Sequence, residues 1–171
     1  HYNGSVWSQT THGLTTDTLN NIWGASANDV FVVGNQGRIL HYDGSIWQMM
    51  AHGLTTATLY DVWGSSGHDV YAVGDGGVVL HYNGSGWSVA AQDVTTYPLY
   101  GISGRLVGGA TPDVYAVGLL GLILHYDGQA WSVVDQDITS RTLRDVWVAA
   151  GGEAFAVGSS GTILAFNGTS W

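Results

Sequence analysis

The chain has 171 residues, of which 45% are hydrophobic and only 10% are charged. Four basic residues, all of them arginine, face thirteen acidic ones, so the formal net charge is −9 at pH 7. This balance argues against nucleic acid as a partner, because phosphate binding needs a dense set of basic side chains. The absence of cysteine excludes disulfides and thiolate metal sites.

Membrane insertion is not expected, because the longest nearly apolar run, residues 114–124, is too short to cross a lipid bilayer. The sequence starts with His1 rather than methionine and carries no signal peptide. We therefore expect it to be a processed or excised part of a longer protein.

One short motif recurs along the whole chain. It reads LHYDGSIW at residues 40–47, and further copies lie at 1–7, 80–87, 124–131 and 164–171. The spacing is 40 residues, except where an insertion at 104–112 stretches it to 44. The chain therefore divides into repeats at approximately 8–47, 48–87, 88–131 and 132–171, preceded by a partial copy at 1–7.

Each repeat contains four short runs rich in Val, Ile, Tyr and Trp and bounded by Gly, Asn or Asp, which is typical of strands. The runs at 70–73 and 78–80 are apolar on both faces, so each sheet is expected to have neighbours on both sides. The sequence thus predicts an all-β protein: a β-propeller of about four 40-residue blades, each a four-stranded antiparallel sheet, in one domain over residues 1–171. A β-sandwich does not predict such regular repetition.

The repeat consensus L.DVWGSS..DVYAVG..G.ILHYDGS.W resembles tandem β-propeller repeats of large secreted bacterial proteins, and it is distantly similar to kelch and Asp-box blades. The resemblance implies a bacterial protein that is secreted or lies at the cell surface. The Asp-to-Trp spacing is shorter than in an Asp-box, so a sialidase-type active site cannot be transferred to this chain. Such folds host many functions.

The hairpin motif occurs five times, whereas the first and second strand types occur four times each. One hairpin is therefore surplus to a closed ring of four blades. The chain is either a segment of a larger propeller or array, or a molecule whose extra hairpin and exposed blade faces pair with a neighbour; closure on itself with a redundant end is the remaining alternative. We expect self-association.

Histidines and carboxylates recur at fixed repeat positions. The histidines His1, His41, His81 and His125 lie on the third strand of successive blades and diverge, so we expect hydrogen bonds between blades and no metal or cofactor. The acids Asp29, Asp69, Asp113 and Glu153 precede the second strand, where a carboxylate can accept backbone N–H groups. No pair of convergent carboxylates is evident, so an enzyme is not expected. A calcium ion at a single loop, for instance at Asp75, is left open.

The tryptophans form two sets. One set opens the fourth strand and is expected in the core: Trp7, Trp47, Trp87, Trp131 and Trp171. The other set, Trp23, Trp63 and Trp147, ends the first strand at one rim, where indoles can stack on sugars or fill the central region. The third repeat breaks the pattern with an inserted loop. We predict a ligand site formed by Trp23, Trp63, Trp147, Arg105 and the adjacent loop residue His68.

Three sequons, at Asn3, Asn83 and Asn167, are candidate glycosylation sites, although Asn-Gly also serves the turn by itself. Taken together, these features predict a non-catalytic extracellular binding or adhesion module that recognises glycan or protein through its rim loops. The alternative is a self-assembling structural protein of a surface fibre or array. A glycosidase-like propeller enzyme is a remote third hypothesis.

Overall fold

The computed structural model describes residues 4–9, 13–51, 53–135 and 138–171, and all of their strands are antiparallel. The first sheet contains β1 (Leu19–Ser26), β2 (Asp29–Gly34), β3 (Ile39–Tyr42) and β4 (Trp47–Met49). The second contains β5 (Leu59–Ser66), β6 (Asp69–Gly74), β7 (Val79–Tyr82) and β8 (Trp87–Val89). The third contains β9 (Leu99–Val107), β10 (Thr111–Gly118), β11 (Ile123–Tyr126) and β12 (Trp131–Asp135). The fourth contains β13 (Leu143–Val148), β14 (Ala154–Gly158) and β15 (Ile163–Phe166).

In every sheet the second and third strands are joined by a short 3₁₀ turn. These turns are η1 (Asn35–Gly37), η2 (Asp75–Gly77), η3 (Leu119–Gly121) and η4 (Ser159–Gly161). The last residue of η2, Gly77, has a φ of +75°, and a Cβ there would collide with the carbonyl oxygen of Thr95. Glycine is therefore required at this position, because the later connection that contains Thr95 passes close to the turn.

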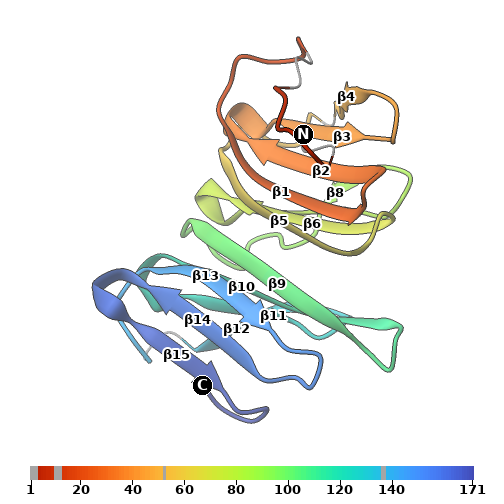
Figure 1. The fold of residues 1–171 in the computed structure, drawn as a ribbon. Helices are drawn as coiled ribbons and strands as arrows, with labels where there is room; N and C mark the ends of the chain where they lie inside the picture. Colours follow the sequence, from red (N-terminus) through yellow and green to blue (C-terminus); the bar gives the residue numbers. More distant parts are fainter. Residues whose placement is uncertain (1–3, 10–12, 52, 136–137) are drawn as a thin grey trace.

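The four sheets are stacked face to face through their innermost strands, as Figure 1 shows. Strand β1 packs against β5, β5 against β9, and β9 against β13. The first and fourth sheets lie at opposite ends of the stack (Figure 1), and most of β1 is exposed. Over the described residues, the blades form an open arc and not a closed ring. The surplus hairpin includes residues 1–3, which lie outside the described part of the chain.

These features confirm the predicted all-β fold with antiparallel propeller blades. The sheets occupy residues 19–49, 59–89, 99–135 and 143–166. Within the described segments, no helix is long and apolar enough to cross a membrane.

The hydrophobic core lies in three seams, each between one sheet and the next. The face of a sheet that enters a seam, here called its leading face, presents an aromatic residue from the second strand: Phe31, Tyr71 or Tyr115. That ring lies 5.7–6.4 Å from a Tyr or Phe and a Trp on the opposing face of the next sheet, here called its trailing face. The trailing face also contributes a fully buried leucine: Leu59, Leu99 or Leu143.

The first tryptophan set divides between the seams and the surface. Trp87, Trp131 and Trp171 pack in the three seams, as expected of core residues. Trp7 is largely exposed, so its expected burial is wrong. Trp131 is buried and Trp87 and Trp171 are half-buried, because an aromatic ring of the preceding sheet packs against each of them, and Trp47 is also half-buried.

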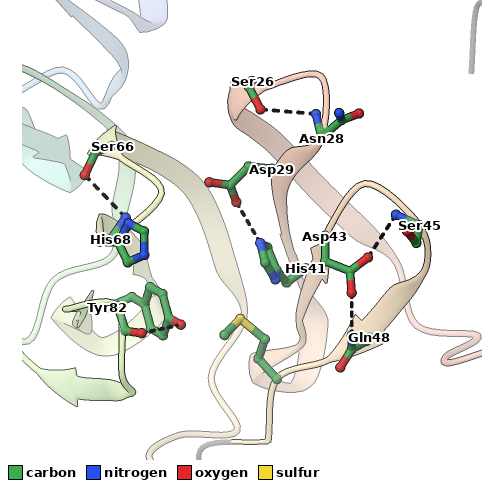
Figure 2. Close-up of polar contacts among 12 residues, drawn as sticks. Ser26, Asn28, Asp29, His41, Asp43, Ser45, Gln48, Ser66, His68 and Tyr82 are labelled. Carbon is green, nitrogen blue, oxygen red and sulfur yellow. Dashed lines mark hydrogen bonds and ion pairs between the residues drawn. The ribbon is translucent and has the colours of Figure 1, made fainter.

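The histidines pair within a sheet, which corrects the expected hydrogen bonds between blades. Nε2 of His41, His81 and His125 lies 2.7 Å from Oδ1 of Asp29, Asp69 and Asp113 respectively. Figure 2 shows the first of these pairs. The reason is register: His41 pairs with Phe31 across β2 and β3, and Asp29, two residues before Phe31, has its side chain on the same face.

The histidine ring also supports the seam. Each one lies 4.4 Å from the second-strand aromatic ring of its own sheet. Burial by itself would raise the pKa of Asp69, but hydrogen bonds from His81 and Ser65 outweigh it and lower that pKa. The fourth sheet has Glu153 and Ala165 at these positions and cannot form the pair.

The seams predict a difference between two leucines that occupy the same repeat position. Leu59 is fully buried in the first seam, whereas Leu19 in the uncovered first sheet is 37% exposed. Leu59→Ala should lower the free energy of unfolding by about 2 to 5 kcal/mol, because it removes buried surface and leaves a cavity. Leu19→Ala should cost less than about 1 kcal/mol. Urea unfolding measures both; equal losses would contradict the open arc.

Candidate functional site

A β-bulge recurs at the start of the innermost strand of every sheet. In β5, Leu59 pairs with Gly74 and Asp61 pairs with Val73, so the intervening residue Tyr60 has no partner in the ladder. The same shift occurs in β1, β9 and β13. A bulge re-aims the side chain of its extra residue. The four residues in question are Asn20, Tyr60, Tyr100 and Arg144, here called the bulge row.

The bulge row makes contacts from sheet to sheet. Asn20 Nδ2 donates to the carbonyl oxygen of Leu59 at 2.8 Å. The rings of Tyr60 and Tyr100 have centroids 5.1 Å apart. The Arg144 guanidinium lies 4.9 Å from the centroid of Tyr100, a cation–π distance. An amide, two phenol rings and a cation thus follow one another across four sheets.

An acid lies beside the row. The Tyr60 hydroxyl donates to Asp75 Oδ1 at 3.0 Å. Burial, followed by this contact with the carboxylate, raises the pKa of Tyr60. The turn that holds Asp75 also lines an open hollow of about 530 Å³, together with Thr55, Val94 and Thr95. Among the described residues, no three metal-ligating side chains gather at one place.

A buried carboxyl group joins three sheets behind the row. Asp61 Oδ1 accepts a hydrogen bond from Asn21 Nδ2 in the first sheet, and Oδ2 accepts one from the Ile102 backbone N–H in the third at 2.7 Å. Burial raises the pKa of Asp61 to about 7, and Asp145 acts in the same direction. A pKa of this kind suits a general acid. In this protein, however, both carboxyl oxygens of Asp61 accept hydrogen bonds inside the seams, so Asp61 holds the sheets together.

Two of the three predicted site tryptophans, Trp23 and Trp63, contact the next sheet. Trp23 and Trp63 are half-buried, and each indole lies where a side chain at Gly64 or Gly104 of the next sheet would lie. Glycine at those positions makes room for the indole. Trp147 has the same place in the fourth sheet and is exposed. Ligand binding by these tryptophans stays a prediction.

The other two predicted site residues are held by local contacts. Arg105 Nε lies 2.8 Å from Asp113 Oδ2, and its Nη1 donates to the Ala150 carbonyl oxygen at 3.0 Å, joining the third sheet to the fourth. His68 is exposed, and its backbone N–H donates to Ser66 Oγ (Figure 2). Trp63 lies over Gly104, next to Arg105 in the chain, so these two predicted residues come from adjoining positions.

The sequons lie in exposed hairpins. Oδ1 of Asn83 accepts the backbone N–H groups of Ser85 and Gly86, and Asn167 makes the equivalent contacts. Asp43 does the same in the first sheet, where Figure 2 shows its bond to Ser45. The side chain thus serves the turn; glycosylation stays a prediction, and Asn3 lies outside the described residues.

The bulge row was not predicted from the sequence. A signal did exist: the residue after the repeated leucine changes from Asn to Tyr, Tyr and Arg, while the leucine itself is constant. A strictly alternating strand would place that residue in a seam. Only the bulge reveals that it leaves the packing face.

Comparison with known proteins identifies the fold. No model of a protein family and no curated protein matches the chain. Among solved structures, it is similar to YCF48 bound to D1 peptide, with a TM-score of 0.60, 15% identity, and coverage of 90% of this chain and 67% of that one. It is also similar to YCF48 from Cyanidioschyzon merolae, with a TM-score of 0.65, 19% identity, and coverage of 91% and 55%. These likenesses confirm the β-propeller; the kelch and Asp-box resemblance and a secreted origin stay predictions.

The raised pKa of Asp61 predicts a pH-dependent stability. The folded pKa of about 7 lies above the ordinary value of 3.8, so the folded state binds the proton more tightly. Protonation of Asp61 therefore makes its full contribution to the free energy of unfolding below pH 3.8, and this contribution is lost as the pH rises through 7. The free energy of unfolding should therefore fall between pH 5 and 7, by up to about 1.4 kcal/mol per pH unit.

Asp61→Asn should remove this slope and also lower stability, because an amide nitrogen would face the Ile102 N–H. The matched control is Asp127→Asn in an exposed hairpin, where asparagine is the natural residue in the second sheet. Urea midpoints of the three proteins across this pH range provide the measurement. An Asp61→Asn variant that keeps the wild-type slope would show that another group carries it.

Proposed function

We propose that the chain is a non-catalytic, protein-binding propeller and that the bulge row is its site for a peptide segment. The observation that carries the proposal is the bulge itself. In each sheet one extra residue turns a side chain away from the seam, and three residue types (Asn, Tyr and Arg) occupy the four positions, whereas the leucine before them is constant. A side chain that the bulge turns out of the seam can vary and can contact a ligand. Side chains that pack in the seams must instead match their neighbours and therefore repeat.

The chemistry of the row suits a peptide. Tyrosine and arginine are enriched at the centres of protein interfaces, since they combine large contact area with hydrogen-bonding groups. The Tyr60 and Tyr100 rings offer surface to an apolar or aromatic side chain. Arg144 is exposed, and over the described residues no ion pair joins it to a carboxylate of this chain. It can therefore bind a carboxylate of the peptide.

One of the fold neighbours supports the proposal, because that YCF48 structure holds a bound D1 peptide. At 15% identity this likeness carries the architecture alone, so the binding site here is argued from this chain's own residues. We further propose the extracellular adhesion role and surface location that the repeat resemblance implies. Glycan recognition by Trp23, Trp63, Trp147, Arg105 and His68 is the second candidate, favoured by the exposed indole of Trp147.

Peptide binding can be tested by selecting phage-displayed random peptides on the 171-residue chain and measuring their affinity by fluorescence anisotropy. Tyr100→Ala should weaken the selected peptides at least about tenfold, because a buried aromatic contact contributes about 1.4 kcal/mol or more. Arg144→Ala should weaken those peptides that carry a carboxylate. Tyr97→Ala is the control, since Tyr97 is a nearby exposed tyrosine that lies outside the row.

Enriched peptides that bind Tyr100→Ala and Arg144→Ala as tightly as the wild type would place the site elsewhere. Failure to enrich any peptide, together with binding on a glycan array that Trp147→Ala abolishes, would favour the second candidate.

A further inference from the structure

The two end faces of the arc are apolar, and both leave large apolar side chains exposed over the described residues. On the leading face of the fourth sheet, Trp147 is 59%, Phe155 46% and Ile163 71% exposed. These residues hold the repeat positions of Trp63, Tyr71 and Val79, which the third sheet covers in the second seam. In the other three sheets the equivalent face is buried against the trailing face of the next sheet. The surface that fits this face is therefore the trailing face of another blade with the same repeat.

The uncovered leading face already has the geometry of a seam. The rings of Trp147 and Phe155 are 6.4 Å apart with 26° between their planes. In the packed second seam, Trp63 and Tyr71 are 6.3 Å apart, also with 26°. Docking therefore requires no rearrangement of these rings, which lowers its entropic cost.

The trailing face of the first sheet offers the matching half. Its Tyr42 and Trp47 are 5.3 Å apart with 34° between their planes. The equivalent Tyr82 and Trp87, which receive Phe31 in the first seam, are 5.4 Å apart with 35°. Ile22, at the position of Val62, is 61% exposed. Two residues of this face, Val32 and Leu40, are already buried, and Tyr42 and Trp47 are half-buried, so its most exposed apolar side chain is Ile22.

Polar groups at the inner edge also match. In the first seam, the Asn21 amide donates to the Asp61 carboxylate. If the fourth sheet meets the first sheet of another chain, the same repeat position brings Asp145 to Asn21. A carboxylate again faces an amide and not a second carboxylate, so the contact avoids like-charge repulsion.

We propose that the leading face of the fourth sheet docks on the trailing face of the first sheet of a second copy, with Phe155 against Tyr42 and Trp47. The contact is heterologous, because the two surfaces differ. Two copies can therefore satisfy each other through two such contacts and so close a ring. The docking continues the three internal seams with the same residue types and does not rest on the peptide site.

Size-exclusion chromatography with light scattering tests the docking. The wild-type chain should have at least twice the 18.1 kDa mass of one chain. Phe155→Asp and Ile22→Asp should each reduce that mass to one chain, since either one places a charge in the contact. Ile46→Asp is the matched control: Ile46 is 58% exposed, and its repeat position holds Gly86, where a Cβ would touch nothing.

Mixing the two variants provides the decisive comparison. Ile22→Asp retains an intact fourth sheet and Phe155→Asp an intact first sheet, so the mixture should regain twice the mass of one chain. Circular dichroism checks each fold, and Ile163→Ser replaces Phe155→Asp if that variant unfolds. A monomeric wild type, dissociation by only one variant, an equal effect of Ile46→Asp, or an oligomer that survives both substitutions would overturn the proposal.

Discussion

The structure depends on one contact: an aromatic ring of the second strand inserted between the histidine of its own sheet and a Tyr or Phe with a Trp of the next. It occurs at Phe31, Tyr71 and Tyr115, with nearly the same distances each time. Because both faces of each sheet are apolar, no sheet can bury its surface alone, and stability comes from the seams. By the same rule, the two end faces of the arc, which no further sheet of the described residues covers, retain exposed apolar side chains.

The bulge separates packing from recognition. Without it, the residue after each repeated leucine would enter a seam and would have to match its neighbour. With one extra residue, the leucine stays buried while Tyr60, Tyr100 and their counterparts leave the seam. Asp61 shows the cost of a polar group on the buried side: it is held by donors from two other sheets, and its pKa is raised. The repeat therefore keeps a constant leucine at the start of each innermost strand, while the bulge residue beside it varies from sheet to sheet.

Most of the fold could be predicted, because strand runs, Asp-Gly turns and the 40-residue period are local or periodic signals. The candidate site could not. His41 was expected to bond across blades, yet it pairs with Asp29, because the register of β2 and β3 places both on one face. Trp23 and Trp63 were predicted to bind a ligand because they end the first strand and were expected at one rim of the propeller. Their contacts with Gly64 and Gly104 depend on how closely successive sheets approach, which no spacing within a repeat reveals.

The amino-acid sequence by itself determined the repeat, the strand content and the turns, because backbone preferences and alternating apolar residues act over a few neighbouring positions. The tertiary structure decided which side chains meet: Asn21 with Asp61, forty residues apart, and Tyr60 with Tyr100. It also decided that the described part of the chain forms an open arc and that the bulge residues form a row. These outcomes depend on strand register and on the approach of whole sheets, and both are set by packing across the seams and not by any short segment.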